Sequence, residues 1–149
     1  MYKASDIMTQ PVISIEATAS ADECIGLMLR HHISGLPVAD SVNRLVGVVT
    51  ELDVIRLLHD PLSNRETPVS AFMTAEVTTV DAEASLIDVA EQFMAGPYRR
   101  LPVLSQGSLV GIVARRDVLR HIWQMRLRAA SELESKRGEG FAIASAQFE

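Results

Sequence analysis

Two four-residue patterns place an aspartate three positions after the point where an apolar run meets an expected helix. The first is Thr50-x-x-Asp53 and the second is Ala114-x-x-Asp117. At a helix start, a hydroxyl and unpaired backbone N–H groups bind phosphate, and an aspartate one turn later offers two oxygens that suit a ribose diol. Thr50 and Asp53 are also the residue types of a helix cap. The aspartate persists in the second pattern without its threonine, which shifts some weight from capping toward ligand binding.

A group of arginines in the second half of the chain is the other candidate for binding. Arg115 and Arg116 fall in the first turn of the expected final helix, where the helix dipole disfavours cations, and Arg99 and Arg100 precede an apolar strand. If these segments meet, four guanidinium groups surround one site, and arginine binds phosphate through paired hydrogen bonds. The alternative is a solvated basic edge, or ion pairs with a partner chain. The first interpretation predicts a ligand that carries phosphate.

The elements that must hold these residues are short. Polar turn formers and apolar runs alternate too quickly for long helices in the first half of the chain. The pattern predicts, in order, a strand over 12–15, a helix capped by Ser20 with Glu23, a hairpin of strands over 36–39 and 45–49, and a helix after Thr50. Each unit is therefore expected to be β-α-β-β-α.

The same pattern occurs twice. Aligning residues 6–40 with 71–105 and 44–56 with 108–120 gives 16 identities in 48 positions. The period is far longer than a one-hairpin repeat, so each copy is expected to be a small subdomain. A sheet with helices on one face leaves its other face apolar, and a second copy can cover it. The fold class expected is α+β, a sandwich-like pair of pseudo-symmetric repeats packed sheet to sheet with ligand-sized crevices between them.

The expected organisation has four parts. Residues 1–59 form the first repeat, 60–70 a linker, 71–124 the second repeat, and 125–149 a helical extension and tail. The apolar face of the last helix continues through Ile122, Trp123, Met125 and Leu127, whereas the matching helix of the first repeat ends near His59. An apolar extension with no partner in its own unit is expected to pack against another chain or against the returning tail, and we predict a two-fold homodimer in which the final helices contribute to the interface.

The composition excludes several classes of function. The net charge of −5 is unsuited to coating nucleic acid, which requires a broad basic field. Cys24 is the only cysteine, the N-terminus has no signal-peptide core, and no apolar run has membrane-spanning length. We therefore expect a cytoplasmic protein that is not held in a membrane. No arrangement of nucleophile and base or of metal ligands has convincing spacing, so no enzyme activity, metal or catalytic cofactor is expected.

The chain resembles a tandem pair of cystathionine-β-synthase (CBS) domains, the unit called a Bateman module. Each repeat begins with Met-Thr, at Met8 and Met73, continues with Leu-Pro-Val, and closes with a Gly-containing strand that leads to Asp53 or Asp117. The resemblance covers about residues 4–124. It implies two clefts per chain for adenosine-containing ligands such as AMP, ADP, ATP or S-adenosylmethionine.

The resemblance also implies roles for particular residues. Thr50 and Asp53 hold phosphate and ribose in one cleft, and Asp117 holds ribose in the other. Adenine is bordered by Val12, Ile13, Val77 and Thr78, and the pockets are closed by Ser34, Gly35, Leu36 and Pro37 and by Arg99, Arg100, Leu101 and Pro102. Arg100 matches a position that often contacts phosphate. Ala114 departs from the family pattern, which has Ser or Thr there, so phosphate binding in the second cleft needs Arg99, Arg115 or Arg116.

We therefore interpret the sequence as a stand-alone CBS pair that binds an adenine nucleotide or S-adenosylmethionine without catalysis and regulates an unidentified enzyme or transporter. The alternative is a structural dimerisation module with vestigial pockets and no physiological ligand.

Overall fold

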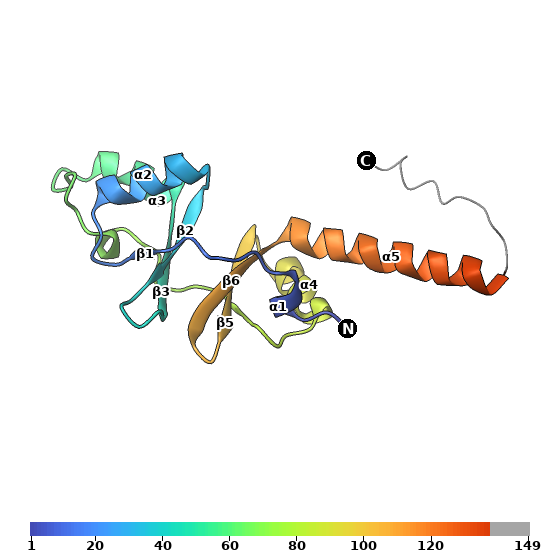
Figure 1. The fold of residues 1–149 in the computed structure, drawn as a ribbon. Helices are drawn as coiled ribbons and strands as arrows, with labels where there is room; N and C mark the ends of the chain where they lie inside the picture. The colour runs from blue at the N-terminus through green and yellow to red at the C-terminus, as the bar shows by residue number, and fades with distance from the viewer. Residues whose placement is uncertain (138–149) are drawn as a thin grey trace.

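The computed structural model describes residues 1–137 and has an α+β fold with two three-stranded mixed sheets (Figure 1). The first repeat contains, in order, α1 (Ala4–Ile7), β1 (Ile15–Glu16), α2 (Ala21–His31), β2 (Gly35–Ala39), β3 (Leu45–Thr50), α3 (Glu51–Arg56) and the 3-10 turn η1 (Leu57–His59). The second contains η2 (Val69–Ala71), β4 (Val80–Asp81), α4 (Leu86–Ala95), β5 (Arg100–Ser105), β6 (Ser108–Ala114) and α5 (Arg115–Arg137). After its first short turn, each repeat is β-α-β-β-α, as the sequence predicted.

The two sheets have the same topology. In the first, β1 lies parallel to β2, and β2 pairs antiparallel with β3. In the second, β4, β5 and β6 repeat this arrangement. A parallel pair needs a crossover, and α2 and α4 supply it in their respective repeats. The helices that carry the aspartate patterns are α3 and α5, and each begins directly where the last strand of its sheet ends.

Local hydrogen bonds explain where the crossover helices begin. The Ser20 hydroxyl caps α2 by accepting from the Glu23 N–H at 3.1 Å. Ser85 caps α4 through the Asp88 N–H, and the Asp88 carboxylate accepts the Ser85 N–H in return. These caps satisfy N–H groups that a helix start otherwise leaves unpaired. The predicted helix starts are confirmed.

The strand predicted over 12–15 is wrong, because β1 contains only Ile15 and Glu16. Its partners in β2 are Val38 and Ala39, and the next pairing position down the strand is Pro37. Val48, opposite Pro37, donates its N–H to Thr74, so the nitrogen of Pro37 faces the β1 side. Proline has no N–H to donate there. The parallel pairing therefore stops, and the segment before Ile15 is left outside the sheet.

The final helix also exceeds the predicted apolar pattern. The apolar rhythm weakens after Ser131, yet α5 continues to Arg137. Residues 126–137 are mostly strong helix formers, which sustain a helix without an apolar face. Figure 1 shows α5 projecting well beyond both sheets. The apolar residues 141–143, predicted to lie in a tail, are outside the described residues.

The repeats exchange their first segments. Ala4 and Ile7 of α1 are buried in the core of the second repeat, and the Ala4 N–H donates to the Ala84 carbonyl at 2.8 Å. Conversely, Val69 of η2 is fully buried in the core of the first repeat, and the Ser70 N–H donates to the Ala17 carbonyl at 2.9 Å. Each core is thus completed by the first segment of the other repeat. This exchange holds the two repeats together.

The exchanged segments continue along the last strand of each sheet. Thr9 exchanges two backbone hydrogen bonds with Ile112 of β6, and Thr74 does the same with Val48 of β3. The methionine before each threonine lies on a glycine of that strand. A Cβ on Gly111 would overlap the Met8 side chain, and a Cβ on Gly47 would come within 2.8 Å of the Met73 sulfur. This close approach explains why both repeats have glycine there.

The single cysteine is a core residue of the first repeat. Cys24 is fully buried, and this burial, followed by the charge of Asp53, raises the pKa of its thiol to about 11. The thiol is therefore protonated at neutral pH. Among the described helices, none is long and apolar enough to cross a lipid bilayer.

Candidate functional site

A cleft of about 450 Å³ lies between the two repeats. The first repeat contributes the segment before β1, the start of β2 and the end of β3, and the second contributes the equivalent start of β5 and end of β6. The residues that line the cleft are Thr9, Pro11, Val12, Ile13, Ile33, Ser34, Gly35, Leu36, Pro37, Val48, Thr50, Tyr98, Arg99, Arg100, Pro102, Ile112, Ala114 and Asp117. Its volume is in the range of small-molecule binding sites.

The Thr50 side of the cleft is a complete helix cap. The Thr50 hydroxyl accepts the Asp53 N–H at 3.2 Å and lies 3.0 Å from the Asp53 Oδ2, which also accepts the Thr50 N–H at 2.9 Å. The other oxygen, Oδ1, faces Arg56 at 3.4 Å. Thr50 lines the cleft and Asp53 does not. Asp53 therefore acts on the cleft by fixing Thr50, whose hydroxyl and backbone N–H are both bonded to Asp53.

The second repeat keeps the carboxylate and loses the hydroxyl. The Asp117 Oδ2 accepts the Ala114 N–H at 2.7 Å, and Oδ1 pairs with Arg120 at 3.2 Å. Asp117 is only 7% exposed but lines the cleft together with Ala114. Because alanine is smaller than threonine, the carboxylate has a path to the cavity here. Asp117 is thus a buried hydrogen-bond acceptor at the cleft wall.

Positive charge at the cleft comes from two arginines of the second repeat. Arg99 and Arg100 both line it, and the Arg100 Nη1 donates to the Ser34 hydroxyl of the first repeat at 3.1 Å. Arg115 turns its Nε to the Tyr98 carbonyl at 2.7 Å, and neither Arg115 nor Arg116 lines the cleft. The structure therefore brings together two of the four arginines considered from the sequence.

Apolar side chains form much of the remaining wall. Val12, Ile13 and Ile33 lie on the side of the first repeat, opposite Ile112 and Pro102 of the second. An apolar wall with a few polar groups is typical of a site that binds a flat organic ring.

The cleft also contains residues that the sequence did not single out: Thr9, Pro11, Ile33, Val48, Tyr98 and Ile112. Ile33 and Tyr98 occupy equivalent positions directly before predicted site segments, so the repeat alignment was the available signal. Thr9, Pro11, Val48 and Ile112 belong to the exchanged segments or to the strands that these segments contact. Besides Arg115 and Arg116, three predicted residues of the second repeat do not line the cleft. Val77 and Thr78 do not line the cleft, and Leu101 is fully buried.

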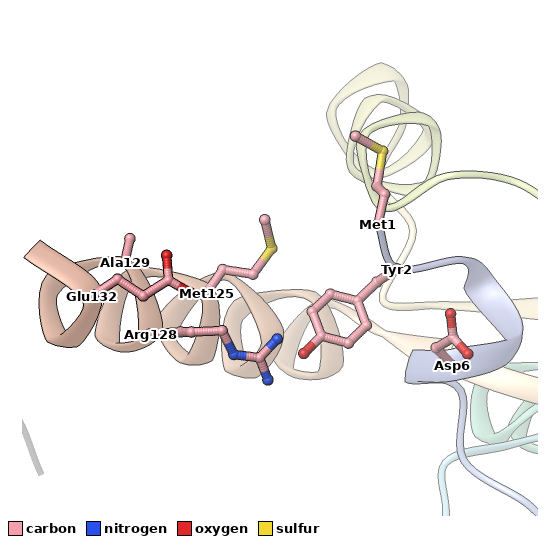
Figure 2. Close-up of a pocket in the computed structure, with 7 residues that line it drawn as sticks. All are labelled: Met1, Tyr2, Asp6, Met125, Arg128, Ala129 and Glu132. Atoms are coloured by element: carbon pink, nitrogen blue, oxygen red, sulfur yellow. The ribbon is translucent and has the colours of Figure 1, made fainter.

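A second hollow lies between the N-terminal segment and α5, away from the repeat interface. Figure 2 shows Tyr2 and Asp6 on one side and the α5 side chains on the other. Its volume is about 670 Å³, and it is lined by Met1, Tyr2, Asp6, Met125, Arg128, Ala129 and Glu132. The polar groups here are exposed chain-end and helix-surface side chains. Within residues 1–137, no three His, Cys, Asp or Glu side chains are grouped to hold a metal ion.

Two similar β-α-β-β-α repeats with exchanged first segments and a cleft between them define a class of two-repeat modules. The CBS domain family matches the chain over residues 4–60 and again over residues 69–124. The chain belongs to this family and contains a tandem pair of CBS domains, a Bateman module.

Solved structures show the same fold with ligands. The crystal structure of CBSX2, a CBS-pair protein of Arabidopsis thaliana, in complex with AMP has a TM-score of 0.75 at 30% identity, covering 85% of this chain and 99% of that one. The CBS domain pair of MJ0100 in complex with 5′-methylthioadenosine and S-adenosyl-L-methionine has a TM-score of 0.70 at 25% identity, covering 84% and 98%.

Curated relatives differ in length. Hypoxic response protein 1 of Mycobacterium tuberculosis is 31% identical over 123 residues, which are 82% of this chain and 86% of that protein. Protein MJ1225 of Methanocaldococcus jannaschii is 35% identical over 115 residues, which are 77% of this chain but only 41% of that protein. The chain spans 16% of the A-adding tRNA nucleotidyltransferase of Geobacter sulfurreducens. CBS pairs like this one thus occur both as most of a protein and as part of an enzyme.

Proposed function

We propose that the chain is a non-catalytic sensor that binds an adenosine-containing ligand, namely AMP, ADP, ATP or S-adenosylmethionine, in the cleft between its repeats. The observation that carries this proposal is the composition of the cleft. It combines apolar walls with the Thr50 cap of one repeat and with Arg100 and Asp117 of the other. These are the partners that a purine, a phosphate and a ribose require. The AMP and S-adenosylmethionine complexes of similar CBS pairs support the same ligand class.

The position of the cleft favours a regulatory role. A ligand that contacts both repeats binds most tightly to one relative arrangement of them, so it shifts the population toward that arrangement. The Arg100–Ser34 hydrogen bond already links the repeats across the cleft. A phosphate is a stronger acceptor for a guanidinium group than a neutral hydroxyl is. Binding therefore replaces a weak link between the repeats by a charged one.

One observation favours the alternative of a structural dimerisation module. The Asp53 and Asp117 carboxylates have partners on both oxygens without any ligand. Such residues serve folding whether or not the cleft is occupied. A vestigial cleft would keep these caps and would bind nothing.

Calorimetric titration separates the two functions. The chain is titrated with AMP, ATP and S-adenosylmethionine, with GMP and inosine monophosphate as controls for the base. We expect saturable binding of at least one adenosine ligand and weaker binding of the controls. If none of the adenosine ligands binds at millimolar concentration, the sensor function is rejected and the structural function stands.

We further propose that the protein acts in the cytoplasm as a homodimer and transmits occupancy of the cleft to an enzyme or transporter. The support is the exposed apolar surface of α5, on which Trp123 is 37% and Met125 43% exposed. Capture of partners with the ligand present and absent tests this step, because a sensor must change its affinity for the partner when it binds the ligand.

A further inference from the structure

The two repeats differ at the place where the base of a nucleotide would lie. In the first repeat this slot is bordered by Ile13 and Ile33, which both line the cleft. With the repeat offset of 65 residues, the equivalent residues of the second repeat are Thr78 and Tyr98. Two aliphatic side chains are thus replaced by two side chains that can bond to each other.

They do bond to each other. The Thr78 hydroxyl and the Tyr98 hydroxyl are 2.9 Å apart. Tyr98 lines the cleft, whereas Thr78 does not. Tyr98 therefore lies between the cavity and Thr78, which belongs to the segment that would border a base in the second repeat.

Further contacts fix this ring. Its edge lies against Gly96, where a Cβ would overlap the ring atoms. The backbone carbonyl of Tyr98 accepts a hydrogen bond from the Arg115 Nε at 2.7 Å. The ring also packs on the core of the second repeat. In the first repeat, the position of Gly96 is held by exposed His31, and Ile33, which packs on the first core, has no hydroxyl that could bond to residue 13.

We propose that Tyr98, held by Thr78, fills the base slot of the second repeat, so that the chain binds a single nucleotide whose base lies between Ile13 and Ile33. This inference rests on the proposed function. The physical reason is steric and polar at once. A purine entering the second slot must displace a large ring and break a hydrogen bond, whereas the first slot offers apolar surface without a competing partner.

Calorimetry with AMP tests the proposal through the number of sites per chain. We expect about one site in the unaltered chain and about two in Tyr98→Ile, which gives the second repeat the residue of the first. Tyr2→Ile is the matched control, because Tyr2 packs on the same core and against His121 but does not line the cleft. This control is expected to keep one site.

The reciprocal change protects the test against a folding defect in Tyr98→Ile. Ile13→Thr combined with Ile33→Tyr installs the closed pair in the first repeat at two partly exposed positions. We expect it to weaken AMP binding at least tenfold, and circular dichroism checks that the fold survives.

The outcomes separate this inference from the proposed function. Two sites in the unaltered chain, or one site in Tyr98→Ile together with undiminished binding in the reciprocal variant, overturn the role of Tyr98 and leave the sensor function intact. If the unaltered chain does not bind AMP and Tyr98→Ile does, Tyr98 closes the slot of the second repeat, and the slot of the first repeat is rejected as a nucleotide site. No binding by any of these proteins rejects both.

Discussion

The aspartates of the two helix starts have the same local geometry. Each accepts the backbone N–H three residues before it and faces an arginine three residues after it, Arg56 or Arg120. Both arginines are more than half exposed, so their ion pairs add little stability. The two carboxylates differ in what separates them from the cleft. Thr50 stands in front of Asp53, whereas Ala114 leaves Asp117 at the wall.

Asp117→Asn is expected to weaken AMP binding by about 1.5–3 kcal/mol, or roughly 10- to 150-fold, because a charged acceptor becomes a neutral amide. The amide oxygen can still cap α5, so most of the folding stability is retained. Calorimetric titration measures the affinity. Asp88→Asn is the matched control, since Asp88 has the same capping role in α4 and does not line the cleft. Equal affinity of the two variants would contradict a ligand role for Asp117.

Arg100→Gln is expected to weaken AMP binding and to flatten its dependence on salt. Exposed charges are screened by salt, so removing the guanidinium removes part of the salt-sensitive attraction. Affinities at about 50 and 300 mM salt give the slope. Arg126→Gln on α5 removes an equal charge outside the cleft and serves as control. The interpretation fails if both variants retain the slope of the unaltered chain.

At the level of elements, the fold depends on exchanged segments. α1 completes the second core, η2 completes the first, and Met8 and Met73 lie on glycines of β6 and β3. The residues just after the first of these segments, Pro11 to Ile13, line the cleft. Because the same stretch of chain joins the core of the second repeat to the cleft between the repeats, packing of α1 and the shape of the site are linked.

Gly111→Ala is expected to destabilise the chain by about 1–3 kcal/mol, because the new methyl group overlaps Met8 and must displace it. Urea unfolding measures the change. Gly26→Ala is the matched control. Gly26 lies in α2 with no atom within 4 Å of an added Cβ, so alanine there is expected to stabilise by about 0.5–1 kcal/mol. A Gly111→Ala chain as stable as the unaltered one would mean that Met8 does not pack on β6.

At the level of the whole molecule, α5 packs on the second repeat at its start and then extends away from it. Val118 and Ile122 pack on the second core, but the helix continues to Arg137 beyond both sheets (Figure 1). Leu133 is 53% exposed on this projecting part. The hollow lined by Tyr2 and Met125 also lies beside α5, outside the cleft (Figure 2). The surface that can contact another chain is therefore separate from the cleft.

We expect the intact chain to be a dimer at micromolar concentration and a chain ending at Leu127 to dimerise more weakly while binding AMP with unchanged affinity. The truncation removes the projecting part of α5 and keeps the residues that pack on the second core. Light scattering coupled to gel filtration measures the mass, and calorimetry measures the affinity. A monomeric intact chain, or equal dimerisation of both chains, would contradict a role for α5 in assembly.

The repeats, the order of the elements and the helix starts could be predicted from the sequence. These features depend on contacts within a few residues, such as Ser20 with Glu23 and Thr50 with Asp53. Such contacts leave the same pattern in both copies, so the repeat alignment finds them without knowledge of the fold. The prediction of a strand over 12–15 failed because the strand length depends on Pro37, a residue of the partner strand.

Tertiary packing sets which residues share the cleft and which core each first segment completes. The hydrogen bond from Arg100 to Ser34 joins residues 66 positions apart, and that between Thr78 and Tyr98 joins residues 20 positions apart. Such contacts depend on how the two repeats lie against each other and on which side chains fill the space between them. The repeat pattern predicts the elements that the two halves share, whereas the contacts between distant residues depend on packing.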